Sequence, residues 1–207
     1  MPRSWARRFA ALCVGFALCG LCRPTHAQVP SRVPTAQGAD GVYDRFDGDL
    51  DLGLALGAEL GTAGQAAPSA RATAHYFSIA GVYASGRLHA ASESAPSLFG
   101  LGVDLRPLFV PRWVKGFETG PGFFDLTLDS LSLSLGAFWA PRERPAPARR
   151  SGFEAEIGFG VPLFASARGL WVEARGALRY PDSGRHEQAL IAALAWHGFV
   201  TTPFSPR

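Results

Sequence analysis

Residues 49–60 read DLDLGLALGAEL, and leucine fills alternate positions over most of this stretch. In a β-strand, successive side chains point to opposite faces of the sheet. One face of this segment would therefore carry mainly leucine, and the other would carry aspartate, glutamate, glycine and alanine. On a helix the same leucines would be scattered around the axis. The segment predicts a strand whose lipid-facing side consists of Leu50, Leu52, Leu54 and Leu56.

The same alternation recurs through the rest of the chain and predicts seven strands in all. Its phase changes inside 123–139, where Asp129-Ser130 is the natural place for a β-bulge. The expected strands are 49–60, 70–85, 98–110, 123–139, 152–164, 169–180 and 188–199.

The length and composition of these strands favour a membrane barrel over a soluble sandwich. The expected strands run from 12 to 17 residues, whereas strands of globular sheets have about 5–6 and a membrane-spanning strand needs about 9–11. Phe123-Phe124 and Phe138-Trp139 bracket one segment, as aromatic residues do at the two surfaces of a membrane barrel. These features predict an all-β fold, a single antiparallel transmembrane β-barrel. Because single-chain bacterial barrels have an even number of strands, we expect eight, with Val42 to Phe46 as the eighth.

The first 27 residues have the composition of a cleaved secretory signal peptide. Arg3, Arg7 and Arg8 precede an uncharged, mostly apolar stretch at 9–21, and Ala27 supplies the small residue before the expected cleavage site. The apolar stretch is shorter than the ~20 residues that a membrane-spanning helix needs. The expected organisation is a signal peptide at 1–27, an N-terminal tail at 28–41, the β-barrel at 42–200 and a C-terminal tail at 201–207.

Removal of the signal peptide would change both the charge and the cysteine content of the chain. The whole chain has 20 basic and 17 acidic residues, and four of the arginines lie in 1–27, which leaves 16 basic residues in the mature part. A balance so close to neutral does not favour nucleic-acid binding. Cys13, Cys19 and Cys22 also lie in this segment, so the mature barrel would have to be stable without disulfides.

In its alternation, size, signal peptide and cysteine-free mature part, the chain resembles the small outer-membrane β-barrel proteins of Gram-negative bacteria, of the OmpA transmembrane-domain, OmpX and OmpW kind. Residues 42–200 carry this resemblance. Leu105–Trp113 (LRPLFVPRW) and Asp125–Trp139 (DLTLDSLSLSLGAFW) are also similar to uncharacterised barrel proteins of proteobacteria and myxobacteria. The resemblance implies a monomer in outer-membrane lipid, inserted by barrel-assembly machinery, with a structural or porin-like narrow-channel role.

Charged residues on the small-residue faces of the expected strands would point into the barrel. Side chains just fill the lumen of an eight-stranded barrel, and a buried charge without a partner is costly. We therefore expect these charges to form ion pairs, while a gated pore and a ligand or proton site stay as alternatives. The expected lumen charges are Asp49, Asp51, Glu59, Arg71, Asp104, Arg106, Glu154, Glu156, Glu173, Arg175 and Arg179.

The sequence predicts neither a catalytic nor a metal site. His75 and Ser78 would face opposite sides of a regular strand, so they would not form a nucleophile–base pair. His197, next to Trp196, is expected at the membrane surface. Zinc-ligand spacing is absent, and no cofactor is expected. The alternatives to a structural or channel role are an outer-membrane lipid-modifying enzyme and a soluble periplasmic lipid-binding β-protein.

Overall fold

Eight antiparallel strands form a closed barrel in which each strand pairs with its neighbours along the chain and the first also pairs with the last. The prediction of an all-β fold with a single eight-stranded antiparallel barrel is confirmed. The expected signal peptide, the N-terminal tail and most of the C-terminal tail lie outside the described residues. The computed structural model of the 207-residue chain describes residues 43, 45, 48–62, 64, 66–88, 97–117, 121–140, 150–182 and 184–202.

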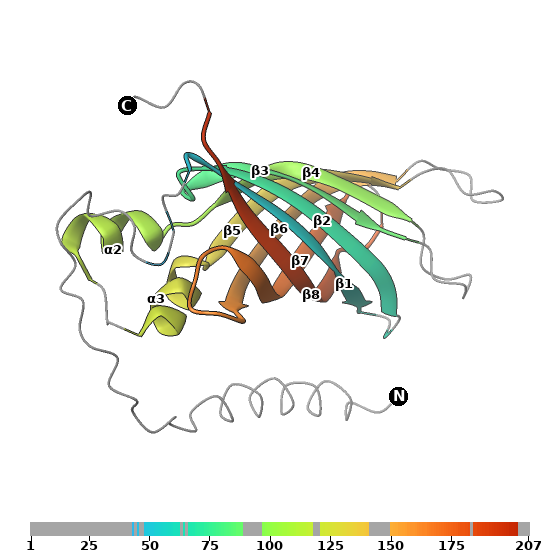
Figure 1. The fold of residues 1–207 in the computed structure, drawn as a ribbon. Helices are drawn as coiled ribbons and strands as arrows, with labels where there is room; N and C mark the ends of the chain where they lie inside the picture. Colours follow the sequence, from blue (N-terminus) through green and yellow to red (C-terminus); the bar gives the residue numbers. More distant parts are fainter. Residues whose placement is uncertain are drawn as a thin grey trace. The chain divides into compact units, whose positions relative to one another are not determined.

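The strands follow one another around the barrel in chain order (Figure 1). Their bounds are β1 Leu50–Gly61, β2 Ala66–Tyr76, β3 Ala80–Arg87, β4 Leu98–Leu105, β5 Ser132–Ala140, β6 Arg150–Pro162, β7 Gly169–Pro181 and β8 Glu187–Val200. Two short helices, α2 (Phe109–Lys115) and α3 (Gly122–Asp129), lie between β4 and β5.

The eighth strand comes from the segment that the sequence predicts as one strand at 70–85. A tight turn at 77–79 interrupts this segment, so that its first part belongs to β2 and its last part to β3. Phe77 and Ser78 adopt φ angles of 48° and 54°, in the left-handed region that a continuous strand does not visit. Phe77 is not a typical turn former, Ser78 is only a weak turn signal without a neighbouring glycine or proline, and the segment is apolar on both faces, so its sequence resembles one long strand.

The segment Val42–Phe46 does not supply the eighth strand, and that prediction is wrong. Of its described residues, Tyr43 lies in a 3₁₀ turn and Arg45 in a turn. Arg45 Nη1 donates a hydrogen bond to Asp129, and Tyr43 Oη donates one of 3.2 Å to Asp125. The segment therefore packs against α3, at the end of the barrel from which β1 begins.

The segment predicted as one bulged strand at 123–139 combines α3 with β5. The phase change at Asp129-Ser130 marks the end of the helix, so the predicted β-bulge is wrong. Asp125 and Asp129 are four residues apart, a spacing that places them on one face of a helix, and both are buried. Phe124, Leu126 and Leu128 also recur at every second position, in the opposite phase to the apolar residues of β5, which explains why the helix resembles a strand.

β4 ends at Leu105, before the end predicted at residue 110. Pro107 follows soon after it and removes one of the backbone donors that a central strand needs. The chain then forms α2, which ends at Gly116 in the left-handed conformation with φ of 61°. The predicted C-terminal part of this strand is therefore a turn followed by the start of α2.

The two ends of the barrel differ in their connections. β1 begins and β8 ends at the end that carries α2 and α3, which we call the helical end (Figure 1). The longest connection of the barrel, residues 106–131 between β4 and β5, lies there. The opposite end, which we call the loop end, carries the connections between β3 and β4 and between β5 and β6.

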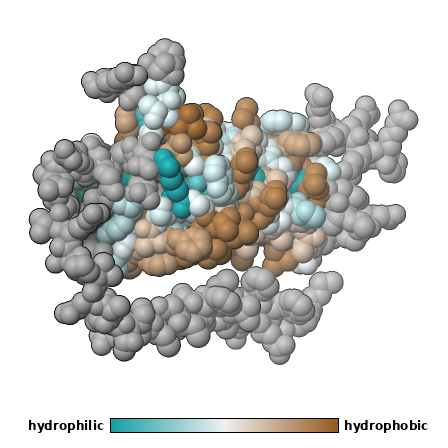
Figure 2. Space-filling model, viewed as in Figure 1, coloured by the Kyte–Doolittle hydropathy of each residue, from teal (hydrophilic) through white to brown (hydrophobic). Residues whose placement is uncertain are grey.

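The outer surface of the barrel is apolar. Leu54 is 60% exposed and Leu56 is 71% exposed, whereas Asp51 and Glu59 on the other face of β1 are each 2% exposed. Figure 2 shows the apolar side chains in brown over the strands. Within the described part of the chain, no helix has both the length and the apolar character needed to cross a membrane. Exposed large side chains, one taken from each strand, are Leu54, Tyr76, Val82, Leu101, Leu135, Ile157, Val172 and Leu194.

Two inward glycines make room for a tyrosine ring inside the barrel. Gly102 of β4 lies opposite Gly136 of β5 on one side and opposite Tyr83 of β3 on the other. A Cβ added at Gly136 would lie 2.4 Å from Tyr83 Oη and 2.5 Å from the Leu101 carbonyl oxygen. Tyr83 is fully buried, and its ring centroid lies 3.8 Å from the guanidinium carbon of Arg71. The two glycines therefore permit the contact between Tyr83 and Arg71.

Gly136→Ala is expected to lower the free energy of unfolding by about 1–3 kcal/mol, because the new methyl group would overlap both the Tyr83 ring and the backbone of β4. Gly86→Ala on β3 is the matched control, since its Cβ would meet nothing closer than Phe99 at 3.8 Å. Urea unfolding of both variants in detergent micelles measures the difference. Equal stability of the two variants would contradict the tight packing of Tyr83.

Candidate functional site in the charged lumen

The interior of the barrel holds a set of charged side chains that we call the lumen network. The alternation of each strand points them inward, and all are at most 9% exposed except Arg106, whose side chain is 14% exposed. Ten of the eleven charges predicted for the lumen lie here, and Asp49 does not. Among the described residues the network consists of Asp51, Glu59, Asp104, Glu154, Glu156, Glu173, Arg71, Arg87, Arg106, Arg175, Arg179, His75 and His197.

Arg71 of β2 occupies the middle of the lumen network. Its guanidinium group donates hydrogen bonds to Glu156 Oε2 at 2.5 Å, Asp104 Oδ1 at 3.2 Å and Ser134 Oγ at 2.9 Å. The ring of Tyr83 covers the same guanidinium group. A planar group with several fixed donors suits this role, which the single ammonium of a lysine would not fill. Arg71 thereby links β2 to β4, β5 and β6 across the lumen.

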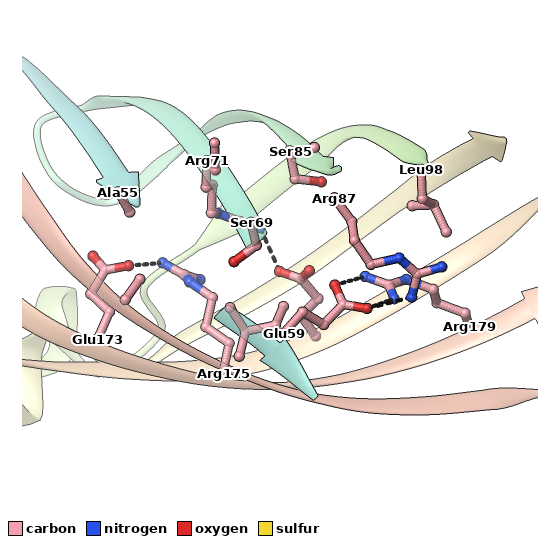
Figure 3. Close-up of a pocket in the computed structure, with 15 residues that line it drawn as sticks. Ala55, Glu59, Ser69, Arg71, Ser85, Arg87, Leu98, Glu173, Arg175 and Arg179 are labelled. Atoms are coloured by element: carbon pink, nitrogen blue, oxygen red, sulfur yellow. Dashed lines mark hydrogen bonds and ion pairs between the residues drawn. The ribbon is translucent and has the colours of Figure 1, made fainter. Parts of the chain in front are cut away.

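Toward the loop end, Glu59 is held between two arginines (Figure 3). Arg179 donates to both Glu59 carboxylate oxygens at 2.5 and 2.9 Å, and Arg87 donates to Glu59 Oε1 at 2.7 Å. Arg179 Nε also donates to Glu154, which accepts a 3.2 Å hydrogen bond from Tyr83 Oη. Bidentate pairing of a guanidinium with a carboxylate is among the strongest side-chain contacts. Arg179 therefore ties β7 to both β1 and β6.

Toward the helical end, His197 bridges two carboxylates. Its Nδ1 lies 3.3 Å from Asp51 Oδ1, and its Nε2 lies 3.1 Å from Glu173 Oε1. Arg106 donates to Asp51 at 2.8 Å, and Arg175 donates to Glu173 at 3.1 Å. The prediction that His197 lies at the membrane surface is wrong, because its side chain points inward and is buried. His197 lies on the inward face of β8, whereas the neighbouring Trp196 faces outward.

His75 is also part of the lumen network rather than of a catalytic pair. Its Nε2 lies 2.6 Å from Asp104 Oδ2. Ser78 is buried as well, but it lies in the turn after β2. Sequence reasoning did not place His75, His197 or Arg87 in the lumen. The signal that finds His75 is its spacing of four residues from Arg71, which places both on the inward face of β2.

Two small cavities lie among the ion pairs of the lumen network. One has a volume of about 30 Å³ (Figure 3), and the other, lined partly by α2 and α3, has about 40 Å³. Cavities of this size hold about two or three water molecules. Arg71 Nε, Arg175 Nε and Glu156 Oε1, which belong to the wall of the first cavity, have no hydrogen-bond partner among the described side chains and backbone. Glu173 and Arg175 line both cavities, so their ion pair stands between the two.

The helical end is closed by α2 and α3, which together we call the helical cap. Phe109 and Leu126 are buried, and Leu126 belongs to an apolar cluster with the strand residues below it. Arg112 of α2 donates to Asp125 at 2.5 Å and to Asp129 at 2.8 Å, both on α3. Burial lowers the pKa of Arg112, but these hydrogen bonds outweigh the effect of burial and raise that pKa. The two helices are therefore joined by a contact in which Arg112 stays protonated at any ordinary pH.

Asp49, predicted among the lumen charges, is buried, but its carboxylate bonds to Thr202 rather than to a charge of the lumen network. It precedes β1 at the helical end, where it accepts a 2.5 Å hydrogen bond from the Thr202 amide and another from the Thr202 hydroxyl group. The hydrogen bond from the Thr202 hydroxyl group, and to a smaller extent the one from the Thr202 amide, lowers the pKa of the Asp49 carboxyl group below its usual value. The contact joins the chain before β1 to the chain after β8, at the seam where the barrel closes.

Asp49→Asn is expected to remove part of the pH dependence of stability. Because the folded-state pKa is depressed, the stabilisation by this carboxylate is fully present above the unfolded-state pKa of about 3.9 and is lost as the pH falls through the folded-state pKa. The difference in unfolding free energy between wild type and variant should therefore shrink from about pH 5 to about pH 2. Asp182→Asn, in the exposed turn after β7, is the comparison variant: it removes one negative charge from a carboxylate that accepts a 2.6 Å hydrogen bond from Ser151. A difference that is constant with pH would contradict the role of Thr202.

The carboxylates of the lumen network face arginine and histidine side chains rather than a shared central point. Among the residues that the structure describes, no group of three or more histidine, cysteine, aspartate or glutamate side chains is arranged to hold a metal ion. The chemistry that this lumen offers is ion pairing and hydrogen bonding around two water-sized cavities.

No protein-family model matches the chain, and no curated protein matches it. Among solved structures, the crystal structure of the N-terminal β-barrel domain of Pseudomonas aeruginosa OprF is similar to it. The two have 13% sequence identity and a TM-score of 0.43, over 72% of this chain and 97% of that chain.

Proposed function

We propose that this chain is an outer-membrane β-barrel protein with a structural role and a closed lumen. The observation that supports the membrane is the outer face, where every strand exposes large apolar residues such as Leu56, Ile157 and Leu194. In water an apolar surface of this extent promotes aggregation, whereas acyl chains solvate it. A closed barrel also leaves no strand edge with unpaired backbone groups, which lipid would not tolerate.

The lumen favours a structural role over an open channel. Ion pairs such as Arg71–Glu156 and Arg179–Glu59 cross it, and the helical cap covers one end. The cavities between them hold only a few water molecules. A narrow channel is the second candidate, because, among the described residues, only the Glu173–Arg175 pair borders both cavities, and its movement would join them.

The proposal locates the protein in the outer membrane of a Gram-negative bacterium, as a monomer surrounded by outer-membrane lipid. The single-chain barrels of that membrane have an even number of strands, as this chain does. Export would use the expected signal peptide at 1–27, and insertion would use the barrel-assembly machinery.

Membrane fractionation combined with gel mobility tests this proposal. We expect the protein in the outer-membrane fraction, released only by detergent, with a mobility that shifts on boiling because the closed barrel resists unfolding by cold detergent. A mature polypeptide that stays in solution without detergent would overturn the proposal. That result would favour the soluble periplasmic lipid-binding protein.

Conductance across a planar lipid bilayer separates the structural role from the channel. We expect the wild-type protein to add no steady ion current to that of the bare bilayer. Asp51→Ala removes the partner of Arg106 and His197, and we expect it to loosen the lumen without preventing insertion. A wild-type current that changes in Asp51→Ala would assign the narrow channel instead.

We also propose that the protein is not an enzyme, since the buried histidines at 75 and 197 bond to carboxylates of the lumen network rather than to a hydroxyl nucleophile. Mass spectrometry of lipid A from cells with and without the protein tests this. An unchanged profile supports the proposal, and a changed acyl pattern would favour a lipid-modifying enzyme.

A further inference from the structure

The outer face of the helical cap is apolar although it lies outside the strands. Its inner face buries Phe109 and Leu126. Lys115 ends α2 beside the outer face. The exposed apolar residues of the outer face, which we call the cap patch, are 42% to 69% exposed and consist of Trp113, Val114, Phe117, Phe123 and Phe124.

The cap patch is held in a fixed orientation by charges on the inner face. Arg112 joins the two helices through Asp125 and Asp129, and Arg45 donates to Asp129 from the chain before β1. Asp125 and Asp129 are buried. Turning the cap patch inward would separate these ion pairs and expose the buried carboxylates. The apolar outer face is therefore a stable feature of the folded chain.

The helix α3 of the helical cap lies against β6, whose outward residues belong to the apolar outer surface of the barrel. Ser130, directly after α3, bonds to both backbone groups of Gly160 on β6 at 2.8 Å. On either side of this glycine, Phe159 and Val161 point outward and are 48% and 37% exposed. Phe164, in the turn after β6 at the same end, is 64% exposed. The apolar outer surface thus extends along β6 to the end of the barrel that carries the helical cap.

We propose that the helical cap is an interfacial lipid anchor, whose cap patch lies in the headgroup region and upper acyl chains of the phospholipid leaflet at the helical end. This inference rests on the proposed function, because it extends the lipid-facing surface of the barrel. Helices of 7 and 8 residues are too short to span a bilayer, but short amphipathic helices lie along its surface. A phospholipid leaflet is the one occupant that meets the strands and the cap patch together.

The chemistry of the cap patch suits that depth. Tryptophan is enriched at membrane–water interfaces, and phenylalanine adds buried apolar area. Lys115 ends α2, and its ammonium nitrogen lies 5.7 Å from the centroid of the Phe117 ring, which places a positive charge at the cap patch, where lipid phosphates would meet it. The same leaflet would surround the outward residues of β6.

Environment-sensitive probes on single cysteines test the anchor. In a chain with Cys13, Cys19 and Cys22 replaced by serine, cysteine is introduced at one position at a time and labelled with a nitrobenzoxadiazole dye. The protein is reconstituted into vesicles of phosphatidylcholine and phosphatidylglycerol, with brominated phospholipid or aqueous iodide as quencher. Cap probes are placed at Val114→Cys and Phe123→Cys. Reference probes are placed at Leu54→Cys on β1 and at Arg185→Cys in the exposed turn at the loop end.

Both cap probes are expected to be quenched by brominated lipid and to have iodide quenching constants about fivefold below that of the Arg185 probe. Cap probes that match the Arg185 probe, together with a lipid-quenched Leu54 probe, would overturn the anchor and leave the barrel proposal intact. That outcome would indicate that the cap patch binds a protein partner instead of lipid. A Leu54 probe that iodide reaches freely would instead overturn the membrane barrel itself.

Discussion

Leu54→Arg is expected to lower the free energy of unfolding in lipid by about 2–4 kcal/mol. Leu54 lies in the middle of β1, opposite Ala72 on β2 and Trp196 on β8, and its side chain is 60% exposed on the outer surface. In a bilayer this position faces acyl chains, where a guanidinium group loses its water without gaining a partner. In a water-soluble protein the same exposed position would accept arginine at almost no cost.

Leu88→Arg is the matched control for this effect. Leu88 is 58% exposed, close to the value for Leu54, but it follows β3 at the loop end. We expect a loss of only about 0–1 kcal/mol there, since the cost of arginine falls toward the membrane surface. Urea unfolding in phospholipid vesicles, followed by gel mobility, measures both variants. A small and equal effect at the two positions would show that the outer face of β1 does not contact lipid.

Arg179→Met is expected to destabilise the barrel by about 3–5 kcal/mol, the cost of breaking a buried ion pair from one side. Arg179 is 2% exposed and pairs with Glu59 and Glu154 at once. Methionine keeps much of the side-chain volume but supplies no donor. Arg87 would still bond to Glu59, whereas Glu154 would keep only its neutral hydrogen bond from Tyr83.

Two further variants show whether the lost ion pairs cause the effect of Arg179→Met. Arg185→Met removes an exposed arginine from the turn before β8, and we expect a change within about 0.5 kcal/mol. Adding Glu154→Gln to Arg179→Met removes the stranded negative charge and should restore part of the stability. Unfolding in the same vesicles provides the comparison. If the double variant is no more stable than Arg179→Met, then loss of packing rather than loss of charge explains the result.

The faces of β1 could be predicted because side-chain direction in a strand depends only on position along the chain. Leu54 is exposed and Asp51 is buried, as the alternation of residues 49–60 indicates. The same reasoning applies to β6, where Glu154 and Glu156 are buried between outward apolar residues.

The helical cap and the turn at 77–79 could not be found by the same reasoning. α3 has eight residues, little more than two turns, and a helix so short shows too few repeats to separate its period from that of a strand. The turn at 77–79 uses Phe77 and Ser78 in the left-handed conformation without a glycine to mark it. Both elements are stabilised by contacts with the rest of the barrel rather than by local preference.

Alternation along single strands is enough to specify a barrel with an apolar outside and a charged inside, because it needs no knowledge of any other strand. The closure and register of the sheet choose which charges meet. Glu59 and Arg179 are 120 residues apart, and Asp51 and His197 are 146 residues apart, yet each pair is in contact inside the lumen. Such contacts depend on how strands at opposite ends of the chain align, and no local pattern contains that alignment.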